Sequence, residues 1–335
     1  MDGERGQAIS RFLAHVGWAD VEPAPLAADA SFRRYFRLAK SGRRAVLMDA
    51  PPPHEDVRPY IHVARLLRGH GLSAPEIYAE DREQGLLLIE DFGDDTYTRL
   101  LAAGGDESVL YALAIDTLVA LQHAVTEPPN LPRYDEAVLI AEASLLTDWY
   151  APAVLDAPLS ADAREEYAEL WRAVLPLAAL PGPTLVLRDY HVDNLMLLPE
   201  RAGVQGCGLL DFQDALCGPP SYDLVSLLED ARRDVPEGLR EAMIARYLAA
   251  LPEVDGGAFR RSAAILAAQR NAKIIGIFTR LWRRDSKPQY LGHIPRVWRL
   301  LEGDLREPAL RDIARWLDRH LPPHLRRVPD RRSSA

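Results

Sequence analysis

Three short apolar segments in the middle of the chain, residues 184–188, 194–198 and 206–211, restrict the fold more than any other feature. Each segment has the length and composition of a buried strand. Asp189 follows the first segment, Asn194 begins the second and Asp211 ends the third. Because strand ends bring such groups to one rim, we expect the three side chains to share a site.

The residue types at these strand ends suit phosphoryl transfer. Carboxylate and amide oxygens are ligands that Mg²⁺ accepts, so we assign Asn194 and Asp211 as metal ligands. Asp189 is the catalytic residue, which accepts the proton of an attacking hydroxyl or orients that hydroxyl. Each residue alone would suit a turn. Their combined spacing favours a phosphotransferase that uses ATP and Mg²⁺, because this chemistry depends on positioning and charge neutralisation.

The front of the chain is rich in strands, and the rear is mainly helical. Residues 34–39 and 43–49 predict a hairpin with a turn at 40–42, and 85–90 predicts a buried strand. The fold class is therefore α+β, with a nucleotide-binding lobe at 1–93, a hinge near 90–93 and a catalytic lobe at 94–335. Helices are expected at 5–16, 55–69, 107–124, 135–150, 161–178, 221–231, 237–250, 258–283 and 308–320.

Composition narrows the function further. The net charge of −9 argues against broad binding to nucleic acid or to a membrane surface. Two cysteines, Cys207 and Cys217, are too few for a disulfide framework. The start of the chain has no apolar signal region, and no apolar run approaches the roughly 20 residues of a membrane span. We therefore expect a cytoplasmic protein, and nothing in the sequence indicates an obligate protein partner.

The segment Leu187-Arg188-Asp189-Tyr190-His191-Val192-Asp193-Asn194 resembles the loop of the aminoglycoside and choline phosphotransferase superfamily. That loop reads His-Gly-Asp-Leu-His-x-x-Asn. The resemblance implies a bilobal protein-kinase-like fold with a small antiparallel-sheet N-lobe and a large, mainly helical C-lobe. Residues 218–224 resemble a second motif of the superfamily, in which we expect Asp223 to cap or brace the following helix.

Further segments, at 29–37, 47–52, 90–93, 211–215 and 269–281, are similar to one branch of this superfamily. That branch contains the anomeric N-acetylmuramate/N-acetylglucosamine kinases of bacterial cell-wall recycling, and the similarity runs from about residue 5 to residue 320. It implies phosphorylation of the C1 hydroxyl of a small sugar. Two alternatives stay open: a kinase for another small hydroxyl compound of the aminoglycoside, choline or homoserine type, and an inactive nucleotide-binding pseudokinase.

The nucleotide site departs from the family pattern. The phosphate-covering loop at 28–34 has no glycine, and Met48 stands where the second strand normally carries a lysine. A neighbouring arginine could replace that lysine, because guanidinium groups match phosphate oxygens. Glu55 is the candidate for the glutamate that usually pairs with it. The residues assigned to the nucleotide are Ser31, Phe32, Arg33, Arg34, Met48, Glu90, Asp91 and Phe92.

In the predicted helix 258–283, two rows of residues spaced four apart are apolar at their ends and polar in the middle. This pattern predicts a polar cavity, because buried polar groups without partners are costly. Lys273 or Arg270 could meet a substrate carboxylate, or form an internal salt bridge to an acid such as Glu142 or Asp148. The residues assigned to the acceptor are Glu142, Tyr150, Asp193, Asp214, Gln269, Arg270 and Lys273.

Overall fold

The computed structural model describes residues 3–26, 32–125, 130–179 and 182–330. It divides into two compact units. Unit 1 comprises Met1–Leu121 and Val192–Ala215, and unit 2 comprises Gln122–His191 and Leu216–Ala335. The expected boundary near residue 93 lies inside unit 1, so the division into a nucleotide-binding and a catalytic lobe stays a prediction.

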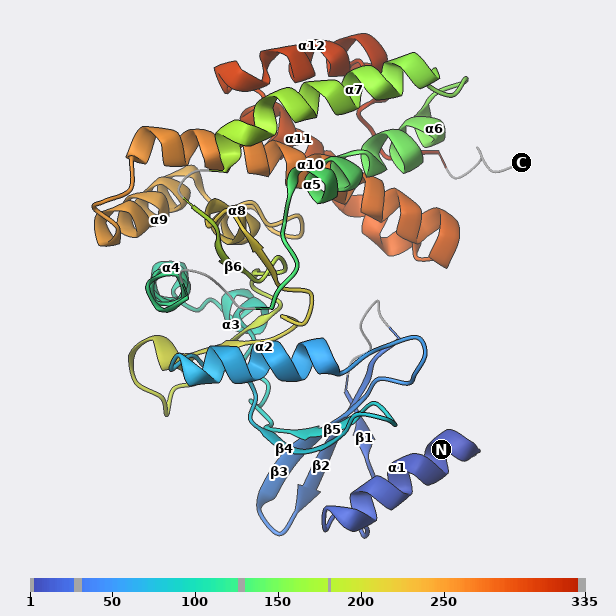
Figure 1. Cartoon of the computed structure of the whole chain (residues 1–335), viewed down its shortest axis with the longest axis vertical. Helices are drawn as coiled ribbons and strands as arrows, with labels where there is room; N and C mark the ends of the chain where they lie inside the picture. The colour runs from blue at the N-terminus through green and yellow to red at the C-terminus, as the bar shows by residue number, and fades with distance from the viewer. Residues whose placement is uncertain (1–2, 27–31, 126–129, 180–181, 331–335) are drawn as a thin grey trace. The chain divides into compact units, whose positions relative to one another are not determined.

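Unit 1 contains an antiparallel five-stranded sheet in the order β1-β2-β3-β5-β4 (Figure 1). The predicted hairpin is confirmed. Its turn uses positive φ angles at both Ser41 and Gly42, which matches the twist of the paired strands. The strands are β1 (Ala24–Pro25), β2 (Arg34–Lys40), β3 (Arg43–Asp49), β4 (Ile77–Asp81) and β5 (Leu86–Ile89).

Helix α1 (Glu4–His15) packs on one face of this sheet, and α2 (Arg58–Gly69) lies on the other side (Figure 1). Leu47 of β3 belongs to the apolar cluster under α1. Since successive side chains of a strand point to opposite faces, Met48 faces away from α1. Unit 1 is completed by α3 (Tyr97–Ala102), α4 (Glu107–Ala124), a 3₁₀ turn (Gly203–Gly206) and the hairpin strands β7 (Leu195–Leu197) and β8 (Cys207–Leu209).

Unit 2 is built around α10 (Gly256–Asp285), which packs against α5, α8 and α11. Gly276 permits a close approach here, because an added Cβ would lie 2.3 Å from the carbonyl of Leu145. The other elements are α5 (Glu136–Ala143), α6 (Ala151–Val154), α7 (Ala161–Val174), β6 (Thr184–Val186), β9 (Leu216–Gly218), α8 (Ser221–Leu228), α9 (Glu237–Ala250), α11 (Ile294–Asp304) and α12 (Arg311–His320). Short 3₁₀ turns lie at Leu175–Ala178, Pro288–His293, Pro308–Leu310 and Pro323–Leu325.

The predicted single helix at 135–150 is wrong. Helix α5 ends at Ala143, and a π-helical turn (Leu146–Tyr150) follows it. The hydroxyl of Ser144 donates to the carbonyl of Ile140, a local bond that competes with regular helix geometry. Other boundaries differ by a few residues. Helix α2, for example, begins at Arg58 rather than at residue 55, and Pro59 lies in its first turn.

Candidate active site

The β7–β8 hairpin brings the two predicted metal ligands together. Asn194 precedes β7 and Asp211 follows β8, and Leu195 pairs with Leu209. The amide of Leu210 donates to the carbonyl of Asn194 at 2.9 Å, so both residues lie at the same end of one hairpin. Asp211 has a φ of 56°, a left-handed conformation that costs energy and is concentrated at functional sites. An amide oxygen and a carboxylate at this end form a donor set that suits a hard divalent cation.

Within the described parts of the chain, no three His, Cys, Asp or Glu side chains converge as a ready-made metal cage. Mg²⁺ in kinases is usually held by one or two protein oxygens together with substrate phosphates and water. The Asn194 and Asp211 pair fits that kind of site.

Arg33 lies against this end of the hairpin. Its guanidinium is 3.4 Å from Oδ1 of Asp211 and 3.8 Å from Oε2 of Glu55, and the residue is only 7% exposed. Burial lowers the pKa of Arg33, but Tyr35 and the surrounding carboxylates outweigh burial and raise it above its ordinary value. The backbone amide of Phe32 also donates to Glu55, at 3.2 Å. Glu55 thus contacts two successive residues of the loop that precedes β2, Phe32 and Arg33.

The two predicted phosphate arginines have different partners. Arg34 forms an ion pair with Asp49, which also binds Arg5 and is fully buried. Met48 is 1% exposed and lies between Tyr35 and Leu87 in the sheet. The structure therefore gives Arg34 a structural partner and directs Arg33 toward Asp211. Ser31 lies outside the described residues.

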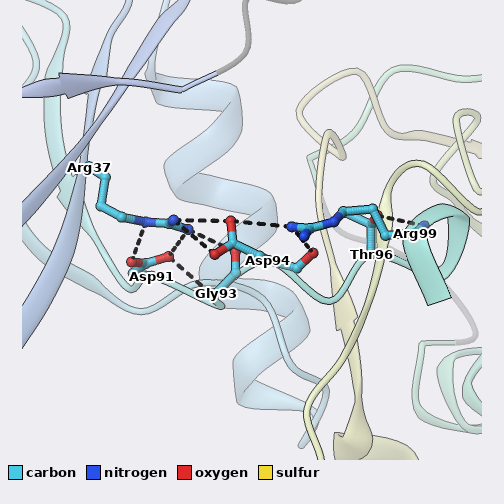
Figure 2. A network of polar contacts seen from close by, with 6 residues as sticks. All are labelled: Arg37, Asp91, Gly93, Asp94, Thr96 and Arg99. Carbon is cyan, nitrogen blue, oxygen red and sulfur yellow. Dashed lines mark hydrogen bonds and ion pairs between the residues drawn. The ribbon is translucent and has the colours of Figure 1, made fainter. Parts of the chain in front are cut away.

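The side chains of the predicted hinge are held by other protein groups. Figure 2 shows Arg37 between Asp91 and Asp94, with Arg99 beyond Asp94. Arg37 donates a hydrogen bond to Oδ1 of Asp91 at 2.9 Å, and its Nε lies 2.7 Å from Oδ2 as an ion pair. The side chain of Glu90 likewise pairs with Arg201. A base at this hinge would therefore meet backbone groups, and the aromatic ring of Phe92, rather than these two carboxylates.

Asp189 belongs to unit 2, where the loop after β6 is fastened to α8. Asp223 accepts hydrogen bonds from the amides of Leu187 and Arg188, at 2.6 and 2.8 Å. The hydroxyl of Ser226 donates to the carbonyl of Arg188 at 3.1 Å. Both backbone groups of Arg188 are thus held, and its φ is 70°. The family motif has glycine at this position, the residue that adopts such angles without steric cost.

The expected role of Asp223 as a helix cap is wrong, because its carboxylate reaches back to the loop that carries Asp189 instead of bonding within α8. Burial raises the pKa of Asp223 to about 7. Asp223, a buried acid, therefore positions Arg188, the residue immediately before the exposed Asp189.

Glu142 is the centre of a second polar cluster in unit 2. It accepts a bond from Lys273 at 2.8 Å, and it also pairs with Arg188 and with the hydroxyl of Tyr134. Gln269 is fully buried and donates to the carbonyl of Leu139 at 2.9 Å. Burial would raise the pKa of Glu142, but Lys273 and Arg188 outweigh it, so the pKa is lowered. The internal salt bridge that the sequence left open for Lys273 is therefore present.

The remaining predicted acceptor residues are dispersed. Arg270 is 5% exposed and donates to the carbonyl of Glu229. Tyr150 is fully buried, and its hydroxyl bonds to the backbone of Leu325 and Arg327, which gives it a structural role instead of the expected acceptor contact.

Two further candidates lie in unit 1, with the predicted metal ligands. Asp193 is held by the hydroxyl of Thr98, and Asp214 accepts from Gln213 at 3.2 Å. Arg188 was missed as a site residue, although its replacement of the family glycine marks the position as unusual.

The comparisons with known proteins identify the family and the fold. The model of the phosphotransferase enzyme family (APH) matches residues 22–257, and the chain therefore belongs to that family. Solved structures show the protein-kinase-like fold. A choline/ethanolamine kinase family protein from Mesorhizobium loti has a TM-score of 0.64 at 14% identity, covering 93% of this chain and 99% of that one. The wild-type aminoglycoside 2′-phosphotransferase-IIIa, in its GDP complex, has a TM-score of 0.60 at 16% identity, covering 90% and 98%.

Two relatives are much more similar in sequence. A protein named N-acetylmuramate/N-acetylglucosamine kinase from Caulobacter vibrioides is 38% identical, over 98% of this chain and 99% of its own length. A protein of the same name from Pseudomonas aeruginosa is 42% identical, over 90% of each chain. In the described residues of this chain, no helix is long and apolar enough to cross a membrane.

Proposed function

We propose that this protein transfers the γ-phosphoryl group of ATP to the anomeric hydroxyl of N-acetylmuramate and N-acetylglucosamine, in the cytoplasm and in the recycling of cell-wall sugars. The family and the names of its relatives support a sugar kinase. The observation that carries the proposal is the hairpin end where Asn194 and Asp211 lie together. It supplies the oxygen ligands that ATP-dependent phosphoryl transfer requires.

Asn194 and Asp211 would hold the divalent cation, for which Mg²⁺ is our assignment. Once bound, such an ion neutralises charge on the phosphate oxygens. Asp189 would bind the anomeric hydroxyl and accept its proton as the new O–P bond forms, while the bond from the γ-phosphorus to the β–γ bridging oxygen breaks and ADP leaves. The brace from Asp223 and Ser226 fixes the backbone directly before Asp189, which suits a group that must orient an acceptor.

Arg33 would take the place of the missing strand lysine. Met48 is buried and apolar and cannot bind phosphate, whereas Arg33 already lies next to Asp211 and Glu55. A guanidinium in this position can bind phosphate oxygens through several N–H groups. Phe32 would contact the nucleotide beside it, and the hinge would bind the adenine edge through its backbone.

An inactive nucleotide-binding module is the second candidate, and Met48 is the observation that favours it. The metal-binding hairpin and the braced Asp189 argue for activity. A choline or aminoglycoside kinase is less consistent with the acceptor side, because a cationic acceptor calls for acidic surroundings, and here the carboxylate of Glu142 already pairs with Arg188 and Lys273.

The proposal is tested by measuring ADP release from Mg²⁺-ATP with and without each N-acetyl sugar, followed by phosphorus NMR of the product. We expect sugar-dependent turnover and a phosphate on C1. Choline, homoserine and an aminoglycoside serve as alternative acceptors in the same assay. A phosphate on another hydroxyl would contradict the anomeric assignment, and ATP binding with no turnover on any acceptor would establish the inactive module.

A further inference from the structure

We propose that Glu229 and Asp304 share one proton and that the pair positions the loop of Asp189, so that activity falls when both acids ionise. All three residues belong to unit 2. The shared proton is independent of any substrate, and only its effect on activity rests on the proposed function. The two acids are positioning residues, because they act on Asp189 through the helix between them and its loop.

Asn271 of α10 lies between the two acids. Its side-chain nitrogen donates to Oε2 of Glu229 at 2.8 Å and to Oδ2 of Asp304 at 2.9 Å. Both N–H groups of this amide are thus used, one for each acid. The two carboxyl groups are also hydrogen-bonded to each other. Because an ionised carboxylate can only accept, that bond requires a proton on one of the two acids.

The surroundings keep this proton on the pair. The side chain of Glu229 is 13% exposed, and Arg240 of α9 lies 3.3 Å from its Oε1. Burial raises the pKa of Asp304 well above its ordinary value, and the charge of Glu229 adds to this effect, whereas Asn271 and Arg240 oppose it. Burial also raises the pKa of Glu229, against Asn271, Arg240 and Arg270. We therefore assign the proton to Asp304.

A cavity of about 700 Å³ adjoins the pair, and both acids belong to its wall. Asp304 is partly exposed, so its proton can exchange with solvent. Arg240 also pairs with Glu237, at 2.5 Å. Arg260 pairs with Glu241, and Arg299 pairs with Asp234. The charged groups that line the same wall as the pair are Asp234, Glu237, Arg240, Glu241, Arg260, Arg299, Arg306 and Glu307.

Helix α8 connects the acid pair to the loop of Asp189. Glu229 directly follows the last residue of α8, and its carbonyl accepts a hydrogen bond from Arg270 of α10 at 3.3 Å. Asp223 and Ser226 of the same helix bind the backbone directly before Asp189. The helix that holds this loop is thus itself fixed to α10 and α11 through the acid pair.

Loss of the shared proton would leave two adjacent carboxylates, which repel each other. The hydrogen bond between them would be lost, and the end of α8 would separate from Asp304 at the end of α11. Asp223 and Ser226 would move with α8. Misplacing a catalytic group by about 1 Å can lower a rate about 100-fold. Since the pKa is raised, the proton leaves as pH rises, and we expect kcat to fall at alkaline pH.

The test uses Asp304→Asn. The new amide can donate to Glu229 and accept from Asn271 as the protonated acid does, but it cannot titrate. Hydrogen exchange of residues 184–191 is measured from about pH 6 to about pH 9. At the alkaline end we expect the amides of Leu187 and Arg188 to exchange about 10-fold faster in the wild type than in the variant. The wild-type kcat should fall by about 10-fold or more relative to the variant over the same range.

Two further variants complete the test. Glu229→Gln also leaves one acid and should behave like Asp304→Asn, so the test does not depend on the folding of one variant. Asp312→Asn is the matched control, because it removes an exposed acid of unit 2 that pairs with Arg315. Its exchange rates and pH profile should follow the wild type. Titration of Asp223 is common to all these proteins and cancels in the comparison.

An infrared spectrum detects the proton directly. At about pH 8, where Asp223 is mostly ionised, the wild type should retain the C=O band of a protonated carboxyl group, and Asp304→Asn should lack it. Absence of that band from the wild type, or parallel exchange and kcat profiles in the wild type and both pair variants, would overturn the inference. If no sugar is phosphorylated, the proposed function fails, and the exchange and infrared results still decide the inference.

Discussion

The proposed metal-binding residues of unit 1, the metal-binding half, and the proposed acceptor-binding residues of unit 2, the acceptor half, have their charges compensated in different ways. Around Asp211 the acids predominate, with Glu55 and Asp214 nearby and Arg33 as the main cation. Around Glu142 two cations, Lys273 and Arg188, pair with the carboxylate, and Asp189 also interacts with Arg188. The acidic surrounding of Asp211 suits a metal ion. Around Glu142, by contrast, the charged side chains hold one another in place.

The largest expected effect separates chemistry from nucleotide binding. Asp189→Asn keeps the size of the side chain but removes the group that accepts the proton, so kcat should fall about 1,000-fold, within the usual range for a general base. ATP affinity should change little, because the residues that we propose for nucleotide binding belong to unit 1. Turnover is measured by ADP release and affinity by titration calorimetry. Retained turnover would remove Asp189 from its role.

Asp211→Asn tests the metal-binding half. The variant keeps an oxygen but loses the charge that holds the cation, so the gain in ATP affinity on adding Mg²⁺ should fall by about 100-fold or more. Calorimetric titrations of ATP with Mg²⁺ and with EDTA measure that gain, and the wild-type protein in EDTA is the control. An unchanged gain would contradict the ligand assignment.

Arg33→Met tests whether this arginine replaces the strand lysine. Loss of a charge-assisted contact to phosphate should raise KM for ATP about 10- to 100-fold and leave KM for the sugar nearly unchanged. Arg34→Met is the matched control, since Arg34 pairs with Asp49. Adding Met48→Lys to Arg33→Met should restore part of the ATP affinity. Equal effects of the two arginine variants would show that Arg33 has no special position.

The two halves also differ in how far the sequence predicts them. Asn194 and Asp211 belong to one short hairpin, so strand patterns and local spacing suffice to bring them together. The partner of Lys273 lies 131 residues away in sequence, and no local pattern chooses between Glu142 and another acid. Arg188 depends on the same long-range packing. The partners of Arg188 can be identified only when α5, α8 and α10 are packed around it.

Prediction of the fold from the sequence is limited in the same way. The long helix α10 and the β2–β3 hairpin follow from periodicity and turn residues alone, and both are confirmed. Strand β9 was not predicted, because its three residues acquire strand geometry only by pairing with β6. Helix α11 was overlooked, although its buried residues have helical spacing: Ile294, Val297, Trp298 and Leu301.

Asp223→Asn tests the brace behind Asp189. The amide side chain offers one acceptor oxygen where the carboxylate offers two, so one of the amides of Leu187 and Arg188 loses its partner. We expect kcat to fall about 10-fold with KM for ATP unaffected. A change in KM for ATP alone would show that the brace does not act on the acceptor half.

Asp223→Asn should also change how the free energy of unfolding depends on pH. Burial raises the pKa of Asp223 from 3.8 to about 7, so the folded protein holds this proton more tightly than the unfolded chain does. Its contribution to the free energy of unfolding is therefore full below about pH 4 and is lost as pH rises to about 7. Urea unfolding across this window should show a smaller decline for Asp223→Asn than for the wild type. Parallel curves would exclude a buried titrating acid.

The smallest effect tests whether Tyr150 belongs to the acceptor half at all. Its hydroxyl bonds to the backbone of Leu325 and Arg327, so Tyr150→Phe leaves buried polar groups without a partner and should lower the free energy of unfolding by about 1 kcal/mol. The kinetic constants for both sugars should stay at wild-type values, because a fully buried side chain that binds the end of the chain has no surface to offer a substrate. Chemical denaturation and the two-sugar assay provide these measurements. A raised KM for either sugar with unchanged stability would return Tyr150 to the acceptor site, and the ion-paired residues around Glu142 would then be only part of it.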